Sequence, residues 1–179
     1  MKNNKGFTLI EVLVSLALIG IIMIPAFSLL KNVLNYENKH TNITLLNQDI
    51  QIIENMVDTY LKQSDNIDSI FSSVSSGDKS SETSELVLDN VILTGKYNSH
   101  SNAKISVLDG NLSIEIGTYS ASTFTTEERM SSGEYISSIT VKPLPSGSTF
   151  ANASGVELKY ILEKGDQTKE MTNRYFFRN

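Results

Sequence analysis

The sequence has no cysteine, only two histidines and only three prolines among its 179 residues. Without cysteine the chain forms neither disulfide bonds nor thiolate metal sites, so any part of it outside the cytoplasm must be held together by packing alone. His40 and His100 lie far apart, and neither is accompanied by other ligands at a spacing typical of metal sites. We therefore predict no metal and no other cofactor, and we expect both histidines to be solvated surface residues.

The chain also lacks clustered positive charge. It carries 15 Lys and Arg against 20 Asp and Glu, a formal net charge of -5. A phosphate-binding surface normally needs clustered Lys and Arg, so bulk charge predicts no nucleic-acid partner. The sequence contains no glycine-rich phosphate loop, no nucleophile elbow and no Ser, His, Asp constellation. Acidic pairs such as Glu127-Glu128, or Asp65 with Asp68, are typical of solvated faces. We predict that the protein is not an enzyme.

One long apolar run, from Phe7 to Leu30, dominates what the sequence does contain. About 20 helical residues cross the hydrocarbon core of a bilayer, so the run predicts a transmembrane helix. Lys2 and Lys5 precede it without an acidic residue, which places the leader in the cytoplasm and the bulk of the chain outside. Glu11 is the single ionisable residue in the run. A carboxylate in apolar surroundings takes up a proton or finds a cation.

Three interpretations of this run compete. A secretory signal peptide has an apolar core of about 7 to 15 residues and a small-residue cleavage site, whereas this run is longer and no such site closes it. An ordinary signal anchor fits the length but does not explain a carboxylate at Glu11, five residues past Gly6. The third interpretation rests on Lys5-Gly6-Phe7-Thr8-Leu9-Ile10-Glu11: a basic leader, then Gly, Phe, a small polar residue, two aliphatic residues and Glu.

This segment resembles the class III signal of type IV prepilins and related pseudopilins. In that family a membrane-embedded aspartyl peptidase cuts after the glycine and N-methylates the new amino terminus. The resemblance implies cleavage between Gly6 and Phe7, methylation of Phe7, and a Glu11 that becomes the fifth residue of the mature chain. It also implies that Glu11 meets the amino terminus of a neighbouring subunit and sets register. Pairing of Glu11 with its own amino terminus, one turn away, is the alternative.

Two residues weaken the expected transmembrane helix, Gly20 and Pro25. Proline cannot donate a hydrogen bond to the carbonyl of Ile21, and its ring crowds that turn, which predicts a kink or a local opening. By analogy with pilins, such a segment loosens when subunits pack into a filament. Proline kinks are also common in ordinary membrane helices.

Beyond Lys31 the helix is expected to become amphipathic and to run to about Lys62. Its apolar residues recur at alternating steps of three and four, and this stripe either packs on a sheet, which we prefer, or forms a coiled coil. The residues of the stripe are Tyr36, Ile43, Leu46, Ile50, Ile53, Val57 and Tyr60.

Strand signals dominate the carboxyl-terminal half. The clearest is a hairpin over Lys104 to Ile116, because Asp109-Gly110 suits a type I′ turn and places Val107 opposite Leu112. The other predicted features, in chain order, are two apolar triplets within Glu85 to Thr94 split by a turn or bulge at Asp89-Asn90, an irregular excursion from Gly117 to Gly133, a strand over Tyr135 to Val141 stopped by Pro143 and Pro145, and a final hairpin turning at Gly165-Asp166.

These patterns predict an α+β, pilin-like fold: a long amino-terminal helix, transmembrane in its first half and amphipathic in its second, packed on an antiparallel β-sheet head. The expected segments are a leader at 1–6, a transmembrane and polymerisation helix at 7–30, an amphipathic continuation at 31–63, a Ser-rich loop at 64–84 and a β-rich globular head at 85–179.

The resemblance implies a structural subunit of a type IV pilus-like filament. The final Tyr175-Phe176-Phe177-Arg178-Asn179 is similar to the ends of PilW-like minor pilins and J-type minor pseudopilins, which favours a minor subunit. The implied partners are other pilin subunits, the prepilin peptidase, a pilus or secretion assembly platform and, before assembly, the cytoplasmic membrane. The implied location is a single-pass membrane protein with its head outside, and then an extracellular pilus or an envelope-spanning pseudopilus.

Two alternatives remain. The same signal serves a pseudopilin of a type II secretion or DNA-uptake system equally well. From another class, the chain is a membrane-anchored extracellular binding module that does not polymerise.

Overall fold

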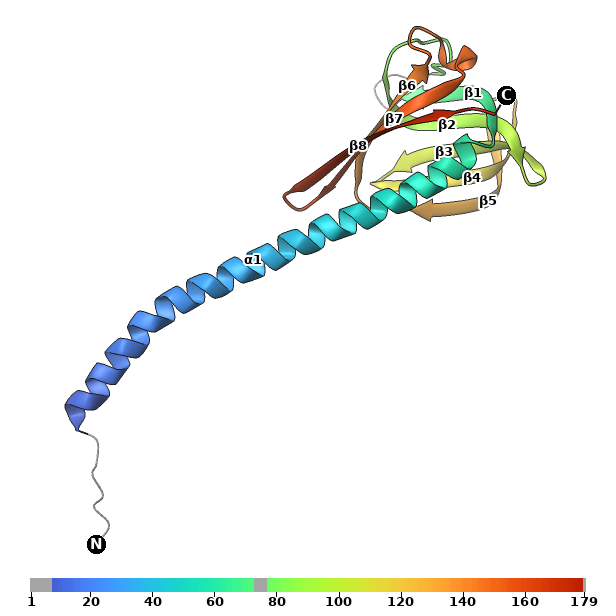
Figure 1. The fold of residues 1–179 in the computed structure, drawn as a ribbon. Coiled ribbons are helices and arrows are strands. Elements are labelled where there is room, and N and C mark those ends of the chain that lie inside the picture. Colours follow the sequence, from blue (N-terminus) through green and yellow to red (C-terminus); the bar gives the residue numbers. More distant parts are fainter. Residues whose placement is uncertain (1–7, 73–76, 179) are drawn as a thin grey trace. The chain divides into compact units, whose positions relative to one another are not determined.

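A computed structural model of the chain describes residues 8–72 and 77–178. The chain divides into two compact units, residues 1–41 and residues 42–179. Within the described residues the elements are α1 (Leu9–Leu61), β1 (Ser64–Ser72), β2 (Leu86–Tyr97), β3 (His100–Leu108), β4 (Asn111–Ser120), β5 (Thr123–Ser132), β6 (Ile136–Leu144), the 3₁₀-helix η1 (Phe150–Asn152), β7 (Gly155–Lys164) and β8 (Gln167–Phe176) (Figure 1).

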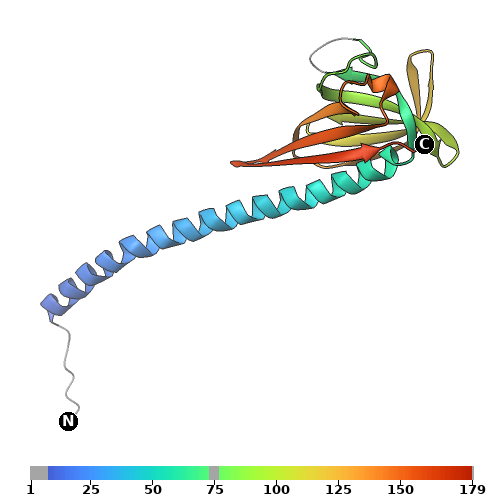
Figure 2. The same cartoon turned by 45° about the horizontal axis from the view of Figure 1, so that its top comes forward.

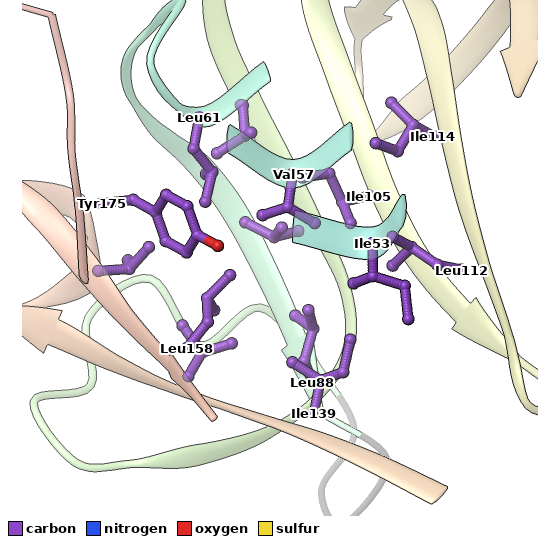
Figure 3. Packing of buried hydrophobic residues seen from close by; sticks show 14 of the residues in the cluster. Ile53, Val57, Leu61, Leu88, Ile105, Leu112, Ile114, Ile139, Leu158 and Tyr175 are labelled. Carbon is purple, nitrogen blue, oxygen red and sulfur yellow. The ribbon is translucent and has the colours of Figure 1, made fainter. Parts of the chain in front are cut away.

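The second unit is built on the last five turns of α1, which lie against the β-sheet. Their buried side chains follow the predicted spacing from Leu46 to Val57, so this part of the expected stripe is confirmed. At its end Leu61 is buried, while Tyr60 is only partly buried. Tyr36, by contrast, is 70% exposed and Ile43 is 37% exposed. Figure 3 shows Ile53, Val57 and Leu61 of the helix among apolar residues from several strands. The buried helix residues are Leu46, Ile50, Ile53, Val57 and Leu61.

The strands form one antiparallel sheet with the order β5-β4-β3-β2-β6-β7-β8, and β1 also pairs with β2. The long strand β2 connects the two parts of this sheet. Its first residues, Leu86 and Val87, pair with β6, while β1 and β3 pair with later positions of β2. The α+β, pilin-like architecture expected from the sequence, a long helix followed by an antiparallel sheet, is confirmed.

Both predicted hairpins are confirmed. In the β3–β4 hairpin, Val107 lies opposite Leu112 and Ile105 opposite Ile114. The turn residues Asp109 and Gly110 have φ angles of 50° and 78°, as a type I′ turn requires. In the β7–β8 hairpin, Lys164 pairs with Gln167 across the two-residue turn Gly165-Asp166.

Two predictions about irregular structure are wrong. The Ser-rich segment begins with β1, because Ile67 and Ile70 are buried and pair with β2. The segment after Gly117 is a regular hairpin in which β5 pairs with β4 along its whole length. In both cases pairing with a neighbouring strand supplied the hydrogen bonds that a polar local sequence does not reveal.

At Asp89-Asn90, where a turn or a bulge was expected, the bulge is confirmed. β2 runs through both residues, and its pairing with β1 shifts from Phe71 opposite Asn90 to Ser72 opposite Leu88, which leaves Asp89 as the extra residue.

Pro143 does not stop the predicted strand either, since β6 continues to Leu144 and Pro143 pairs with Val156 of β7. On its other side β6 pairs with β2 only at Thr140 and Val141. Beyond those residues β6 is an edge, where a missing N–H donor is tolerated.

The core of the second unit is tightly packed. The apolar residues from α1 and the strands enclose a void of only about 10 Å³, about the volume of one water-sized probe. The largest fully buried side chains include Tyr97, Tyr160 and Phe150. The interior therefore contains no space for a ligand.

A polar contact joins the end of α1 to β1 and β2. The Ser64 hydroxyl donates to the Tyr60 carbonyl at 2.7 Å and lies 2.7 Å from the Tyr97 hydroxyl. Because the one Ser64 proton is used, Tyr97 is the donor in the second bond. Burial raises the pKa of Tyr97 to about 12, with the bond to Ser64 opposing the rise and the charge of Asp65 adding to it.

The carboxyl terminus is fastened at the same place. The Arg178 amide donates to the Ser64 carbonyl at 2.7 Å, and its guanidinium lies 3.1 Å from the Asp65 carboxylate. Tyr175 and Phe177 are buried while Phe176 is exposed. Two of the three final aromatic residues therefore pack into the core of the head.

Truncation of the helix stripe should destabilise the head in proportion to burial. Ile53 is 1% exposed and its neighbour Ile52 is 44% exposed. We expect Ile53→Ala to lower the free energy of unfolding by about 2–5 kcal/mol, and Ile52→Ala by about 0.5 kcal/mol or less. Urea unfolding of the full chain in detergent micelles measures both. Equal losses would contradict the assignment of the buried face.

Candidate functional site

The first half of α1 exposes apolar side chains on every face. Each large apolar side chain from Leu9 to Leu34 is exposed in this chain. A helix that is apolar all round is normally buried in protein or in lipid. Among the described residues, α1 is the one helix long and apolar enough to cross a membrane, judged by length and composition. This surface needs lipid or other apolar helices around it.

A capping box begins this helix. Thr8 is the N-cap residue and Glu11 lies at the third helical position. The Thr8 backbone amide and the Thr8 hydroxyl each donate to Glu11 Oε2 at 2.8 Å. In return the Glu11 amide donates to Thr8 Oγ1, at a long 3.4 Å. These reciprocal bonds satisfy amides that have no partner within the helix, and a carboxylate near a helix amino terminus is also favoured by the helix dipole.

The role of Thr8 was not among the expectations, although the sequence contains a signal for it. The pattern Thr-x-x-Glu ahead of an apolar run is the signature of a capping box, and it is present at Thr8-Leu9-Ile10-Glu11. In this chain the Glu11 carboxylate accepts bonds from its own first turn, so it already has partners before any neighbour arrives.

Gly6 and Phe7, the predicted positions of cleavage and methylation, lie outside the described residues. Glu11 follows within the first turn of α1. The expected kink at Gly20 and Pro25 stays a prediction: α1 is helical through both residues. A side chain at Gly20 would meet no atom within 4 Å in this chain, so nothing here requires glycine at that position.

The two histidines differ from each other. The His40 ring lies 6.2 Å from the Tyr36 ring on an exposed part of α1, as expected for a surface residue. His100, in contrast, has a side chain only 14% exposed, with Nδ1 at 3.4 Å from Glu127 Oε2. The expectation that His100 is solvated is wrong, because the β4–β5 hairpin brings Glu127 beside it.

Comparison with known proteins supports the reading of the amino terminus. A family model described as "Prokaryotic N-terminal methylation motif" matches residues 1–27. No curated protein and no solved structure matches the chain. The amino-terminal segment is thus a type IV pilin-like prepilin signal, and it is followed by an α+β, pilin-like fold.

The prepilin signal and the fold together indicate the general role and location of the chain. The motif and the fold support a role like that of type IV pilins and pseudopilins, and the signal implies processing and assembly with pilus components in general. The exposed apolar helix fits a membrane-anchored protein.

Removal of the cap should loosen the first turn of α1. We expect Thr8→Ala to destabilise that turn by about 0.5–2 kcal/mol, while Thr8→Ser, which keeps a hydroxyl, should stay near wild type. Amide hydrogen exchange at Leu9 to Val12 in detergent micelles measures the effect. Unchanged exchange in Thr8→Ala would show that the capping box contributes nothing to the helix start.

Proposed function

We propose that the protein is a structural subunit, most consistent with a minor pilin, of a type IV pilus-like filament. In this proposal the prepilin peptidase cuts after Gly6 and methylates Phe7, and the head lies outside the cytoplasmic membrane until the subunit is extracted. The observation that supports it is the coincidence, on one helix, of the methylation motif with an apolar surface exposed on all sides.

The exposed surface constrains how the subunit leaves the membrane. Moving more than 20 apolar residues out of lipid costs about 0.8 kcal/mol for each methylene group that becomes wet. Extraction is therefore feasible only if lipid is exchanged for the equivalent helices of other subunits. The segment from Leu9 to Leu34 then serves as membrane anchor first and as polymerisation surface afterwards.

Glu11 would change partners during this transfer. Before assembly its carboxylate accepts bonds from Thr8, and in the filament it would accept a charged bond from the methylated amine of Phe7 in a neighbouring subunit. Desolvation offsets much of the attraction in a buried ion pair, so such a pair contributes little to stability. A buried carboxylate without a cation is costly, however, so every alignment of the helices that leaves Glu11 unpaired is disfavoured. The pair therefore selects one register.

Determining where the mature chain begins tests whether the leader is removed and the new amino terminus methylated. Mass spectrometry of protein isolated from its host membranes should detect a chain that begins at methylated Phe7 and lacks residues 1–6. A membrane-anchored binding module that does not polymerise needs no such processing. An intact leader in the native protein would refute the proposed function.

Substitutions of Glu11 distinguish its role in capping the helix from its proposed role in setting the register between subunits. Glu11→Gln retains an acceptor at the third helical position, which serves in a capping box, but has no charge to pair with an amine. We expect this variant to be processed normally and to enter sheared filaments about tenfold less than wild type, with Glu11→Leu at least as impaired. Quantitative immunoblots of filament and membrane fractions measure the ratio. Normal incorporation of Glu11→Gln would rule out the charge-based register role.

A further inference from the structure

The face of the sheet opposite α1 is largely polar, and the register of the strands decides which residues lie on it. On strands β1 to β5 the residues that alternate with the core residues line up across neighbouring strands in two rows. The first row is Ser69, Ile92, Lys104, Glu115 and Arg129, and the second is Phe71, Asn90, Ser106, Ser113 and Ser131.

The β4–β5 hairpin bends over this face. Its pairing shifts between Ile116 and Gly117, and a side chain at Gly117 would meet the Thr125 carbonyl oxygen at 1.9 Å, so only glycine fits there. Beyond the shift, the Tyr119 amide donates to Asn102 Oδ1 at 3.0 Å. The Tyr119 hydroxyl accepts from Ser69 Oγ at 3.4 Å, although β2 and β3 separate β1 from β4. Figure 2 shows the tan tip of this hairpin standing away from the sheet.

Two open hollows lie on this face, and the bent tip lines one of them. One, of about 430 Å³, lies where the small side chains of Ser106, Ser113 and Ser131 leave space beside longer neighbours. The other, of about 350 Å³, is lined by aromatic rings, those of Phe71, Tyr119 and Phe124. Asn90 and Lys104 line both hollows, so the two are adjacent, and together they are called the groove below. Ile92, on this face and apart from the main core, is only 3% exposed.

Glu115 pairs with both positive charges of the groove. Its side chain is 3% exposed and accepts bonds from Thr126 Oγ1 at 2.6 Å, from Lys104 Nζ at 3.4 Å and from the Arg129 guanidinium. Burial raises the pKa of Glu115, but these bonds and charges outweigh it and hold the pKa below its usual value. Both cations that line the groove are thus engaged by one buried carboxylate.

The remaining charges of the lining are negative. Asp89 and Asp109 lie at the end of the serine-lined hollow, so three carboxylates face two cations over the whole groove. The lining therefore has no net positive charge, which disfavours phosphate and sulfate groups.

The groove does offer hydrogen bonds to an uncharged ligand. Its lining alternates amides, hydroxyls and carboxylates, and the Ser113 hydroxyl oxygen is buried without a hydrogen-bond partner among the described residues. At the other end, the rings of Phe124 and Tyr119 line the hollow beside polar groups, with Lys104 Nζ over the Phe124 ring at 5.7 Å from its centre. Pockets that combine apolar surface with a few placed polar groups fix a ligand's orientation.

We propose that this groove binds a short, neutral oligosaccharide. A sugar chain carries donors and acceptors along its edges and apolar C–H faces suited to aromatic rings, and it has no charge to conflict with the net negative lining. Two joined hollows suit an extended chain of several sugar units better than a compact ligand. The inference is independent of whether the subunit polymerises.

The test uses the full chain in lipid nanodiscs on an array of neutral oligosaccharides, with sulfated and sialylated oligosaccharides and short peptides as competing probes. We expect retention of neutral oligosaccharides. Phe124→Ala removes a ring of the groove, and Ser131→Gln fills the serine-lined hollow without changing charge. Each should weaken binding about tenfold or more. The matched controls outside the groove, Phe176→Ala and Ser137→Gln, should bind as wild type.

A second measurement needs no variant. Amide hydrogen exchange of the wild-type chain, with the best-retained oligosaccharide added, should slow in β3 and β4 and stay unchanged in β7 and β8. The proposal is overturned if no neutral oligosaccharide is retained, if the charged oligosaccharides or the peptides are preferred, or if slowing occurs away from the groove. It is likewise overturned if both groove variants, folded by circular dichroism, bind as well as the controls.

Discussion

Burial of one stripe of α1 against the sheet is the contact on which the rest of the head depends. Leu46, Ile50, Ile53, Val57 and Leu61 each remove an apolar side chain from water, worth about 1.5–3 kcal/mol apiece. An antiparallel sheet needs a partner for one face, and here a single helix supplies it to strands from both parts of the sheet. The same helix begins with the apolar segment that the methylation motif marks.

Successive side chains along the strands point to opposite faces of the sheet, and the two faces have different roles. The residues at one parity pack under α1, and those at the other parity form the polar groove. Because side chains of adjacent residues point to opposite faces, Ile114 enters the core while its neighbours Ser113 and Glu115 line the groove. The groove is therefore a consequence of the same register that builds the core. A shift of one residue in β4 would destroy both.

The sequence predicted best where the determinants are close together in the chain. The Asp109-Gly110 turn and its alternating flanks specified the β3–β4 hairpin, and the stripe of α1 specified the buried face. The prediction failed for β1 and β5, whose polar sequences resemble loops. β5 has no buried residue at all, so no hydrophobic alternation marked it, and its order comes from hydrogen bonds to β4.

The sequence by itself determined the kind of amino-terminal signal, since the methylation motif, the apolar length and the position of Glu11 are all local properties of residues 1–27. It also contained the Thr8 to Glu11 capping box, which needs only one helical turn to form. Tertiary structure alone decided that Glu115 is buried among Lys104, Arg129 and Thr126, and that Tyr119 reaches across to Ser69. These residues are far apart in the chain, and only strand pairing and the bend at Gly117 bring them together.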